Sequence, residues 1–253
     1  KHIKNSEINI TSSTTCEGFT EGGDFCGTET PYKVYFAAEF DRPANEIGTW
    51  SGKELTQSLT NQGKNSGAFF TFTTENNKEV HYRVAISFVS IKNAKENLMS
   101  EKLNTSFDGY LANTQNVWNK HLSKIKISTS NDDKKVQFYT NFYHSLIHPN
   151  IVSDINGDYM GADFKVYNNS NGKEHYSSFS VWDTYRTQAQ LLAMLFPKES
   201  SEMMQSLVNF AEQAGGYGRW ILANIETGIM QGDPTPILIS NSFAFGAKDF
   251  DLK

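Results

Sequence analysis

The fold of the first part of the chain is decided by residues 32–40, which read Tyr-Lys-Val-Tyr-Phe-Ala-Ala-Glu-Phe. Every second residue from Val34 to Phe40 is apolar, and this period of two is typical of a strand with one buried face. Residues 68–74 and 80–91 alternate in the same way, and clusters of Gly, Asn and Ser separate the three runs. In the third run, the residues that share the apolar face are Val80, Tyr82, Val84, Ile86 and Phe88. Such runs predict an antiparallel sheet domain.

The periodicity changes after residue 105. Apolar residues in 136–147 and in 203–211 follow the three-and-four spacing of amphipathic helices, and residues 180–196 also indicate a helix. A short strand is expected at 125–127. Thr235 followed by Pro236 predicts the N-cap and first position of a helix that runs to Gly246. Strands followed by helices favour an α+β chain of two domains over an alternating α/β fold.

Composition excludes several classes of protein. A chain of 253 residues has room for two modest domains, and its 38% hydrophobic content is that of a folded protein. The net charge of −5 argues against a nucleic-acid partner, and no apolar run approaches the length of a membrane span. The chain starts at Lys1 without an initiator Met or a signal peptide, so we expect a processed or truncated start. Cys16 and Cys26 are too few for a disulfide framework, and they could be bonded or free.

Two motifs have ordinary explanations. His144 and His148 have a spacing that could bind zinc, but the Glu of the metalloprotease motif is missing, so packing or helix-end capping is expected. Residues 154–158, Asp-Ile-Asn-Gly-Asp, suggest a calcium loop, but an EF-hand needs Gly at its sixth position and Glu at its twelfth. Lys165 occupies the twelfth position, and an Asx-type turn explains the segment better.

Residues 182–186, Trp-Asp-Thr-Tyr-Arg, form the densest group of side chains suited to chemistry. On a helix, Trp182 and Arg186 share a face and Asp183 is offset by one residue. A Trp ring can stack on a sugar, and Asp or Arg can hold hydroxyls by charge-assisted hydrogen bonds. The alternative is an internal Asp–Arg pair that joins two helices, and the spacing leaves both interpretations open.

Two Gly- and Pro-rich loops complete the set of motifs. Residues 215–220 carry Arg219 and Trp220, and residues 231–236 carry Asp233. Both loops lie at helix ends, where binding residues gather. Asp233 precedes a predicted helix, so stabilisation of the helix N-terminus would also account for it.

Residues 138–150, 178–186, 215–220 and 228–234 occur in the order seen in family 92 glycoside hydrolases. Residues 25–27, 35–41 and 86–90 resemble the sheet domain of that family, so the resemblance covers nearly the whole chain. It implies an N-terminal antiparallel β-supersandwich (1–105), a helical linker with a short strand (106–130) and the start of an (α/α)6 catalytic barrel (131–253). Tyr217-Gly218 stands where the family usually has Trp-Leu-Pro before its basic residue and Trp, so the pocket shape is expected to differ.

The resemblance also implies a function, namely calcium-dependent removal of terminal mannose from α-linked mannosides with inversion. Inversion uses one carboxyl group as acid and another as base on opposite faces of the sugar. We expect both carboxyl groups, and most calcium ligands, to lie beyond Lys253. No catalytic residue is therefore assigned in this chain, and its metal ligands are unknown. The chain alone is expected to be inactive. The residues expected to bind substrate are Asp183, Arg186, Trp182, Arg219, Trp220, Asp233 and Cys26.

The expected partners are mannose-containing glycans and not nucleic acid, and the incomplete barrel favours association. A secreted, periplasmic or cell-surface location is expected. Two alternative functions remain open. A non-catalytic glycan-binding module is one, because β-sandwiches of this type often bind carbohydrate without cleaving it. An inverting phosphorylase is the other, but it would need a phosphate site of basic residues, and Arg and His are scarce in the motifs.

Overall fold

The computed structural model describes residues 3–23, 25, 28, 30–103, 105–169 and 171–252. The chain forms two compact units, each assembled from three segments. The first unit comprises Lys1–Lys102, Val152–Lys173 and Ala223–Gly228, and the second comprises Leu103–Ile151, Glu174–Leu222 and Ile229–Lys253. The boundaries predicted near residues 105 and 130 assumed domains continuous in sequence, whereas the two units are interleaved.

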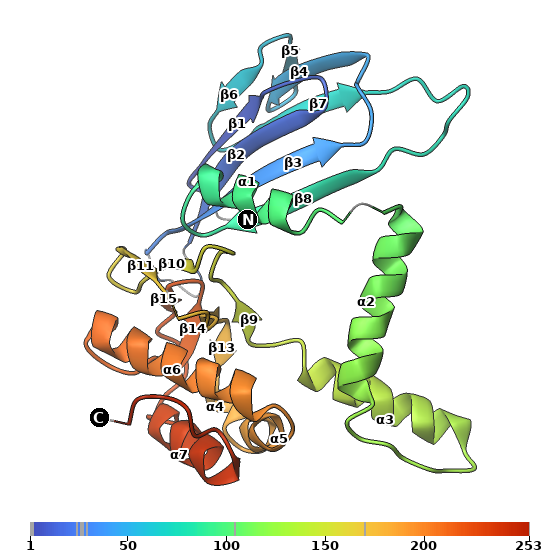
Figure 1. Cartoon of the computed structure of the whole chain (residues 1–253). Coiled ribbons are helices and arrows are strands. Elements are labelled where there is room, and N and C mark those ends of the chain that lie inside the picture. The colour runs from blue at the N-terminus through green and yellow to red at the C-terminus, as the bar shows by residue number, and fades with distance from the viewer. Residues whose placement is uncertain are drawn as a thin grey trace. The chain divides into compact units, whose positions relative to one another are not determined.

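The N-terminal segment of the first unit forms two antiparallel sheets (Figure 1). The five-stranded sheet has the order β6-β1-β2-β3-β8 and the three-stranded sheet has the order β5-β4-β7. Their strands are β1 (Asn5–Ile10), β2 (Thr15–Gly22), β3 (Tyr32–Phe40), β4 (Glu46–Ser51), β5 (Glu54–Thr56), β6 (Thr60–Gln62), β7 (Ser66–Thr71) and β8 (Tyr82–Ser87). The strand predicted at 32–40 is β3.

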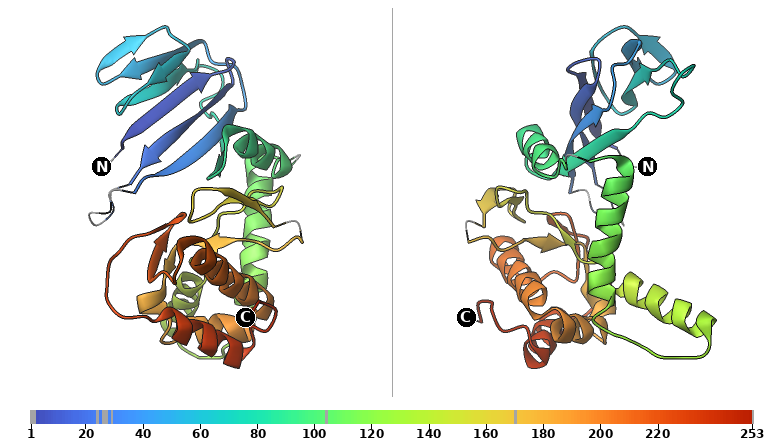
Figure 2. Two further views of the ribbon diagram at one scale, coloured as in Figure 1. Left: turned by 90° about the vertical axis from the view of Figure 1, so that its left-hand side faces the viewer. Right: turned by 45° about the vertical axis from the view of Figure 1, so that its right-hand side comes forward.

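The two sheets pack as a sandwich, as the alternation predicted (Figure 2). Ile10, Cys16 and Ala38 of the larger sheet are buried, and Ile47 and Phe70 of the smaller sheet pack against them. Burial also raises the pKa of the free Cys16 thiol to about 11, since the thiolate loses hydration. This apolar contact between layers is what makes the first unit a domain.

The strand predicted at 80–91 is shorter than expected, and its apolar face is not covered by the sandwich. Tyr82, Val84 and Ile86 are 65%, 50% and 52% exposed. The strand ends at Ser87, because the Ser87 hydroxyl accepts the N–H of Val89 at 2.9 Å and of the next residue at 3.3 Å, which turns the chain. A helix that the sequence reasoning missed, α1 (Ile91–Ser100), follows with Ser90 as its N-cap.

The inserted segment of the first unit carries β10 (Asp158–Met160) and β11 (Val166–Asn168), and β15 (Ile225–Glu226) lies in its last segment. The predicted Asx-type turn is confirmed, since the Asp158 N–H donates to Asn156 Oδ1 at 2.9 Å. Asp154 is only 4% exposed, and its carboxylate accepts hydrogen bonds from side chains of β8 and α1. The donors are Ser87 Oγ at 2.8 Å, Asn93 Nδ2 at 2.8 Å and Asn97 Nδ2 at 2.7 Å. This network fastens the insertion to the sandwich.

The second unit is mainly helical, which agrees with the predicted change of period. Its helices are α2 (Phe107–Leu122), α3 (Asp132–Ser145), α4 (Val181–Thr184), α5 (Gln188–Leu195), α6 (Pro197–Ala214) and α7 (Thr235–Phe245). Its short strands are β9 (Asn150–Ile151), β12 (Tyr176–Ser177), β13 (Phe179–Ser180) and β14 (Trp220–Leu222).

The strand predicted at 125–127 is wrong. These residues form neither helix nor strand, and Ile125 packs instead against the helical core of Phe142, Leu192 and Phe196. Apolar alternation over three residues therefore reflected contact with helices and not membership of a sheet. Within the described residues, the helices lack the length and apolar content needed to cross a membrane.

Candidate functional site

Backbone contacts in the second unit bring together the three motifs selected from the sequence. Ser180 in β13 pairs with Trp220 in β14, and the Val181 N–H donates to the Arg219 carbonyl at 3.1 Å. Thr235 Oγ1 donates to the Gly218 carbonyl at 2.5 Å. The segment 178–186 therefore lies beside 215–220, which in turn is bonded to the first residue of α7, directly after the 231–234 loop.

Thr235 was predicted as the N-cap of the last helix, and that prediction is wrong. Pro234 is the N-cap and Thr235 is the first residue of α7, with no exposed surface. Its hydroxyl is used for the contact with Gly218 and not for capping. Asp233 is exposed and precedes the cap, so its side chain does not cap α7.

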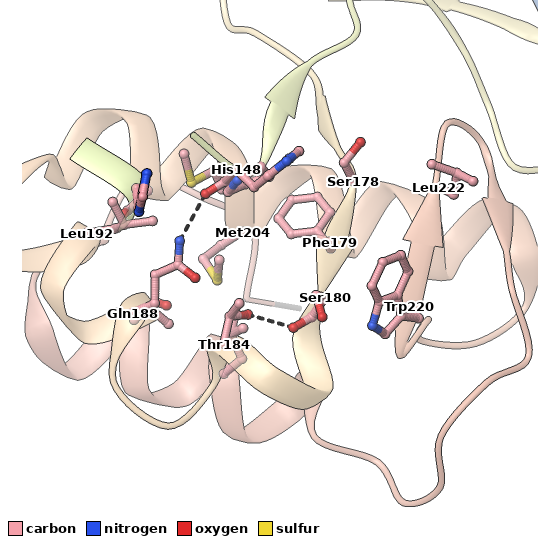
Figure 3. Close-up of a pocket in the computed structure, with 17 residues that line it drawn as sticks. His148, Ser178, Phe179, Ser180, Thr184, Gln188, Leu192, Met204, Trp220 and Leu222 are labelled. Atoms are coloured by element: carbon pink, nitrogen blue, oxygen red, sulfur yellow. Dashed lines mark hydrogen bonds between the residues drawn. The ribbon is translucent and has the colours of Figure 1, made fainter. Parts of the chain in front are cut away.

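Asp183 lies on the short helix α4, which starts directly after β13. The Ser180 hydroxyl donates to the Asp183 carboxylate. The Thr184 hydroxyl donates to the Ser180 carbonyl at 3.0 Å (Figure 3). Asp183 is exposed, so the carboxylate keeps acceptor capacity for a further partner. The Ser180 hydroxyl thus orients the Asp183 carboxylate, and the carboxylate can still accept hydrogen bonds from a ligand.

Arg186 lies over two aromatic rings. Its guanidinium carbon is 5.2 Å from the ring centroids of both Trp182 and Tyr185, a distance suited to cation–π attraction. The single helix predicted over 180–196 is interrupted, because α4 ends at Thr184 and α5 begins at Gln188, so Arg186 contacts the Trp182 ring from the turn between them and not from a shared helical face. Within the described part of the chain, the Asp183 carboxylate contacts the Ser180 hydroxyl and Arg186 lies over aromatic rings, which disfavours an internal Asp183–Arg186 pair.

A cavity of about 370 Å³ opens beside β13 and β14. Its polar lining includes Ser180, Thr184 and Gln188, and its apolar lining includes Met204 and Leu192 (Figure 3). Trp220 is the predicted site residue that lines it. Asp183 lies one residue from the lining residue Thr184, whereas Arg186 and Asp233 are outside the lining.

Sequence reasoning missed two residues of this cavity. His144 and His148 both line it and both are exposed, so neither packs in the interior; of the two expected roles, helix-end capping agrees with the place of His144 in the last turn of α3. Gln188 Nε2 donates to the carbonyls of Ser145 at 2.8 Å and His148 at 3.1 Å, which holds the end of α3 against α5. The four-residue spacing indicated a shared face, but nothing local indicated that this face borders a cavity.

Two loops of the site hold residues other than Gly in the left-handed region of backbone space. Ser178 has φ of 63° and Met230 has φ of 62°, and they belong to the motifs 178–186 and 228–234. Such residues cost roughly 1–3 kcal/mol and cluster where a binding surface has to be shaped in advance. Their positions, two residues before Ser180 and three before Asp233, support a functional role for these loops.

No calcium ligand is assigned among the described residues. Calcium takes six to eight oxygen ligands. The described ranges contain no group of three or more His, Cys, Asp or Glu side chains placed to hold a metal. Cys26, the remaining predicted site residue, lies outside the described residues.

Comparison with family models gives two matches that together cover nearly the whole chain. Residues 1–87 match the glycosyl hydrolase family 92 N-terminal domain, and residues 93–253 match the glycosyl hydrolase family 92 catalytic domain. A comparison with curated proteins found no match.

Solved structures agree with the family models. A family GH92 alpha-mannosidase from Bacteroides thetaiotaomicron has 25% identity and a TM-score of 0.90, with 98% of this chain and 34% of that chain covered. A family GH92 inverting mannosidase from the VPI-5482 strain of that organism has 23% identity and a TM-score of 0.89, with the same coverage of 98% and 34%. The chain therefore spans about a third of the length of these mannosidases.

Proposed function

Because the chain belongs to glycosyl hydrolase family 92, we propose that it is part of an enzyme that removes terminal mannose from α-linked mannosides with inversion. The observation that carries the proposal is the convergence of the three motifs through the Val181–Arg219 and Thr235–Gly218 hydrogen bonds. Helices α3, α5, α6 and α7 would then be the first helices of a catalytic (α/α)6 barrel. The expected substrates are mannose-containing glycans.

In this proposal, Asp183 binds hydroxyls of the terminal mannose. Its carboxylate is oriented by Ser180 and is exposed, so it can accept hydrogen bonds from two neighbouring hydroxyls. Trp220 at the edge of the cavity offers an apolar ring for the C–H face of the sugar. Arg186, held over Trp182, supplies donors that Lys could not supply with the same planar geometry. Arg219 and Asp233 complete the polar surroundings.

The proton chemistry is assigned to none of these residues. An inverting hydrolase needs an acid and a base about 6.5–9.5 Å apart, with the water between base and sugar. Asp183 is assigned to binding because its carboxylate already accepts a hydrogen bond from the Ser180 hydroxyl, and Asp233 is an exposed residue outside the cavity lining. We propose calcium dependence because of the family, and no residue of this chain is assigned to the metal.

The test is a mannosidase assay with an aryl α-mannoside and α-mannobiose, on the 253-residue chain and on the gene product that contains it. We expect the longer product to release mannose as the inverted anomer, visible by NMR, and the 253-residue chain to be inactive. Asp183→Ala should lower kcat/KM about ten- to a hundredfold through lost charged hydrogen bonds. Asp183→Asn should lose less, and Asp132→Ala, an exposed carboxylate on α3, serves as the matched control.

Three outcomes would contradict parts of the proposal. No mannosidase activity in the longer product would reject the function. Unchanged kinetics in Asp183→Ala would reject the assigned binding role. Turnover by the 253-residue chain at the rate of the longer product would place the catalytic pair within this chain, with Asp183 and Asp233 as its candidates.

A further inference from the structure

A second cavity, of about 160 Å³, lies wholly within the first unit. Glu21 of β2 and Lys33 and Tyr35 of β3 line one side of it. Glu21 pairs across the strands with Lys33, whereas the sandwich residue Cys16 pairs with Ala38, on the opposite face of the sheet. This cavity therefore opens on the outer face of the five-stranded sheet, and the packing of the two sheets does not explain its aromatic lining.

Four aromatic side chains line this small cavity, Tyr32, Tyr35, Phe88 and Phe164. Phe164 is unusual because it is 53% exposed and has φ of 61°. Bulky side chains rarely adopt the left-handed backbone conformation. Because half of the Phe164 side chain is exposed, its burial contributes little free energy to offset that conformation. Neither backbone preference nor core packing accounts for a Phe at this position.

The turn that carries Phe164 is braced on several sides. The Gly161 carbonyl accepts the Phe164 N–H at 3.0 Å and Asn224 Nδ2 at 3.1 Å, and the Gly161 N–H donates to the Lys165 carbonyl at 2.8 Å. A Cβ at Gly161 would lie 2.6 Å from the Tyr167 ring, so the turn requires Gly there. The ring of Phe164 is thus presented by a rigid loop, as in a preorganised binding site.

The polar lining is close to neutral. Glu21 Oε2 and Lys33 Nζ are 3.5 Å apart, so a carboxylate and an ammonium group neutralise each other at the edge of the cavity. This pairing disfavours an isolated anion or cation as the ligand but gives one acceptor and one donor for hydroxyl groups. Drug-sized ligands use pockets of roughly 300–1,000 Å³. A cavity of 160 Å³ therefore suits one small ring.

We propose that this cavity is a glycan-binding subsite that holds one neutral pyranose ring against Phe164 and Tyr35, with its hydroxyls toward Glu21 and Lys33. The inference rests on the proposed function in one respect, namely that the substrate is a mannose-containing glycan. The subsite is built from residues that the proposed function does not use, so the two can be tested separately.

The test measures binding of α-mannobiose to the 253-residue chain by saturation-transfer NMR, with Kd from titration. In an Asp183→Ala background, residual binding should remain. Adding Phe164→Ala to that background should weaken the residual binding about tenfold, as expected for the loss of one ring contact. In the same background, Phe164→Tyr should bind with the Kd of the chain that has Phe164. Tyr82→Ala, which removes another exposed aromatic residue of the same unit, should leave this Kd unchanged. Circular dichroism checks that the variants remain folded.

The outcomes separate the two hypotheses. If Asp183→Ala alone abolishes binding and Phe164→Ala has no effect, the subsite is rejected and the proposed function stands. If Phe164→Ala abolishes binding and Asp183→Ala has no effect, the subsite stands and the assigned mannose site fails. Absence of binding in the unmodified chain rejects the subsite, while mannosidase activity in the longer product would still support the proposed function.

Discussion

Replacing Asp154 by Ala should strongly destabilise the first unit. Ser87, Asn93 and Asn97 each donate a side-chain hydrogen bond to this carboxylate at 2.7–2.8 Å. A hydrogen bond to a charged group is worth about 1.5–3 kcal/mol. Three of them would exceed 4 kcal/mol, but burial of the charge offsets part of this, as the raised pKa of Asp154 indicates. We therefore expect a loss of about 3–5 kcal/mol in the free energy of unfolding.

Two further variants sharpen this expectation. Asp154→Asn keeps the volume and one acceptor, but it turns an NH₂ group toward the amides of Asn93 and Asn97, so an intermediate loss of about 1–3 kcal/mol is expected. Glu75→Ala, in the loop between β7 and β8, is the control, because this carboxylate is exposed and lies outside the network, so the change should be within about 0.5 kcal/mol.

The assay is urea unfolding by circular dichroism together with hydrogen exchange of peptides that cover 86–100 and 152–160. Faster exchange in both segments is expected for Asp154→Ala, since the network joins them. A loss below about 1 kcal/mol, or increased exchange confined to the second unit, would refute the reasoning that the network fastens the insertion to the sandwich.

Three further predictions concern individual residues. Thr235→Val should lower stability by about 1–3 kcal/mol and speed exchange at 218–222, because the buried Gly218 carbonyl loses its donor, whereas Thr235→Ser should be close to the unmodified protein in both measurements. Hydrogen bonds from Asn168 and Asn93 lower the pKa of Asp158 in the folded state. The ionised Asp158 side chain therefore stabilises the folded chain above about pH 4, and this stabilisation is lost as the pH falls. In acid titrations, Asp158→Asn should make the free energy of unfolding decline less steeply below about pH 4. In a Cys26→Ser background, the buried Cys16 thiol, with its pKa raised to about 11, should react with iodoacetamide at pH 8 far more slowly in the folded chain than in urea.

Local periodicity was sufficient to predict several elements. The alternation of residues 32–40 predicted β3, and the spacing of apolar residues at 136–147 and 203–211 predicted helices that correspond to α3 and α6. These signals are readable because a strand or helix repeats its buried positions every two or 3.6 residues within one segment. The motif order was likewise sufficient to identify the family, which the family models confirm.

Contacts between distant segments were decided only by the tertiary structure. The Thr235 hydroxyl looked like a helix cap in sequence, but it bonds to a carbonyl 17 residues away. His148 was expected to pack or to cap a helix end, but it borders a cavity, because β13, α5 and α6 leave space beside it. Residues 152–173 join the sandwich through Asp154, although their sequence neighbours belong to the helical unit. Burial and long-range hydrogen bonds depend on which segments meet, and residue spacing within one segment carries no information about that.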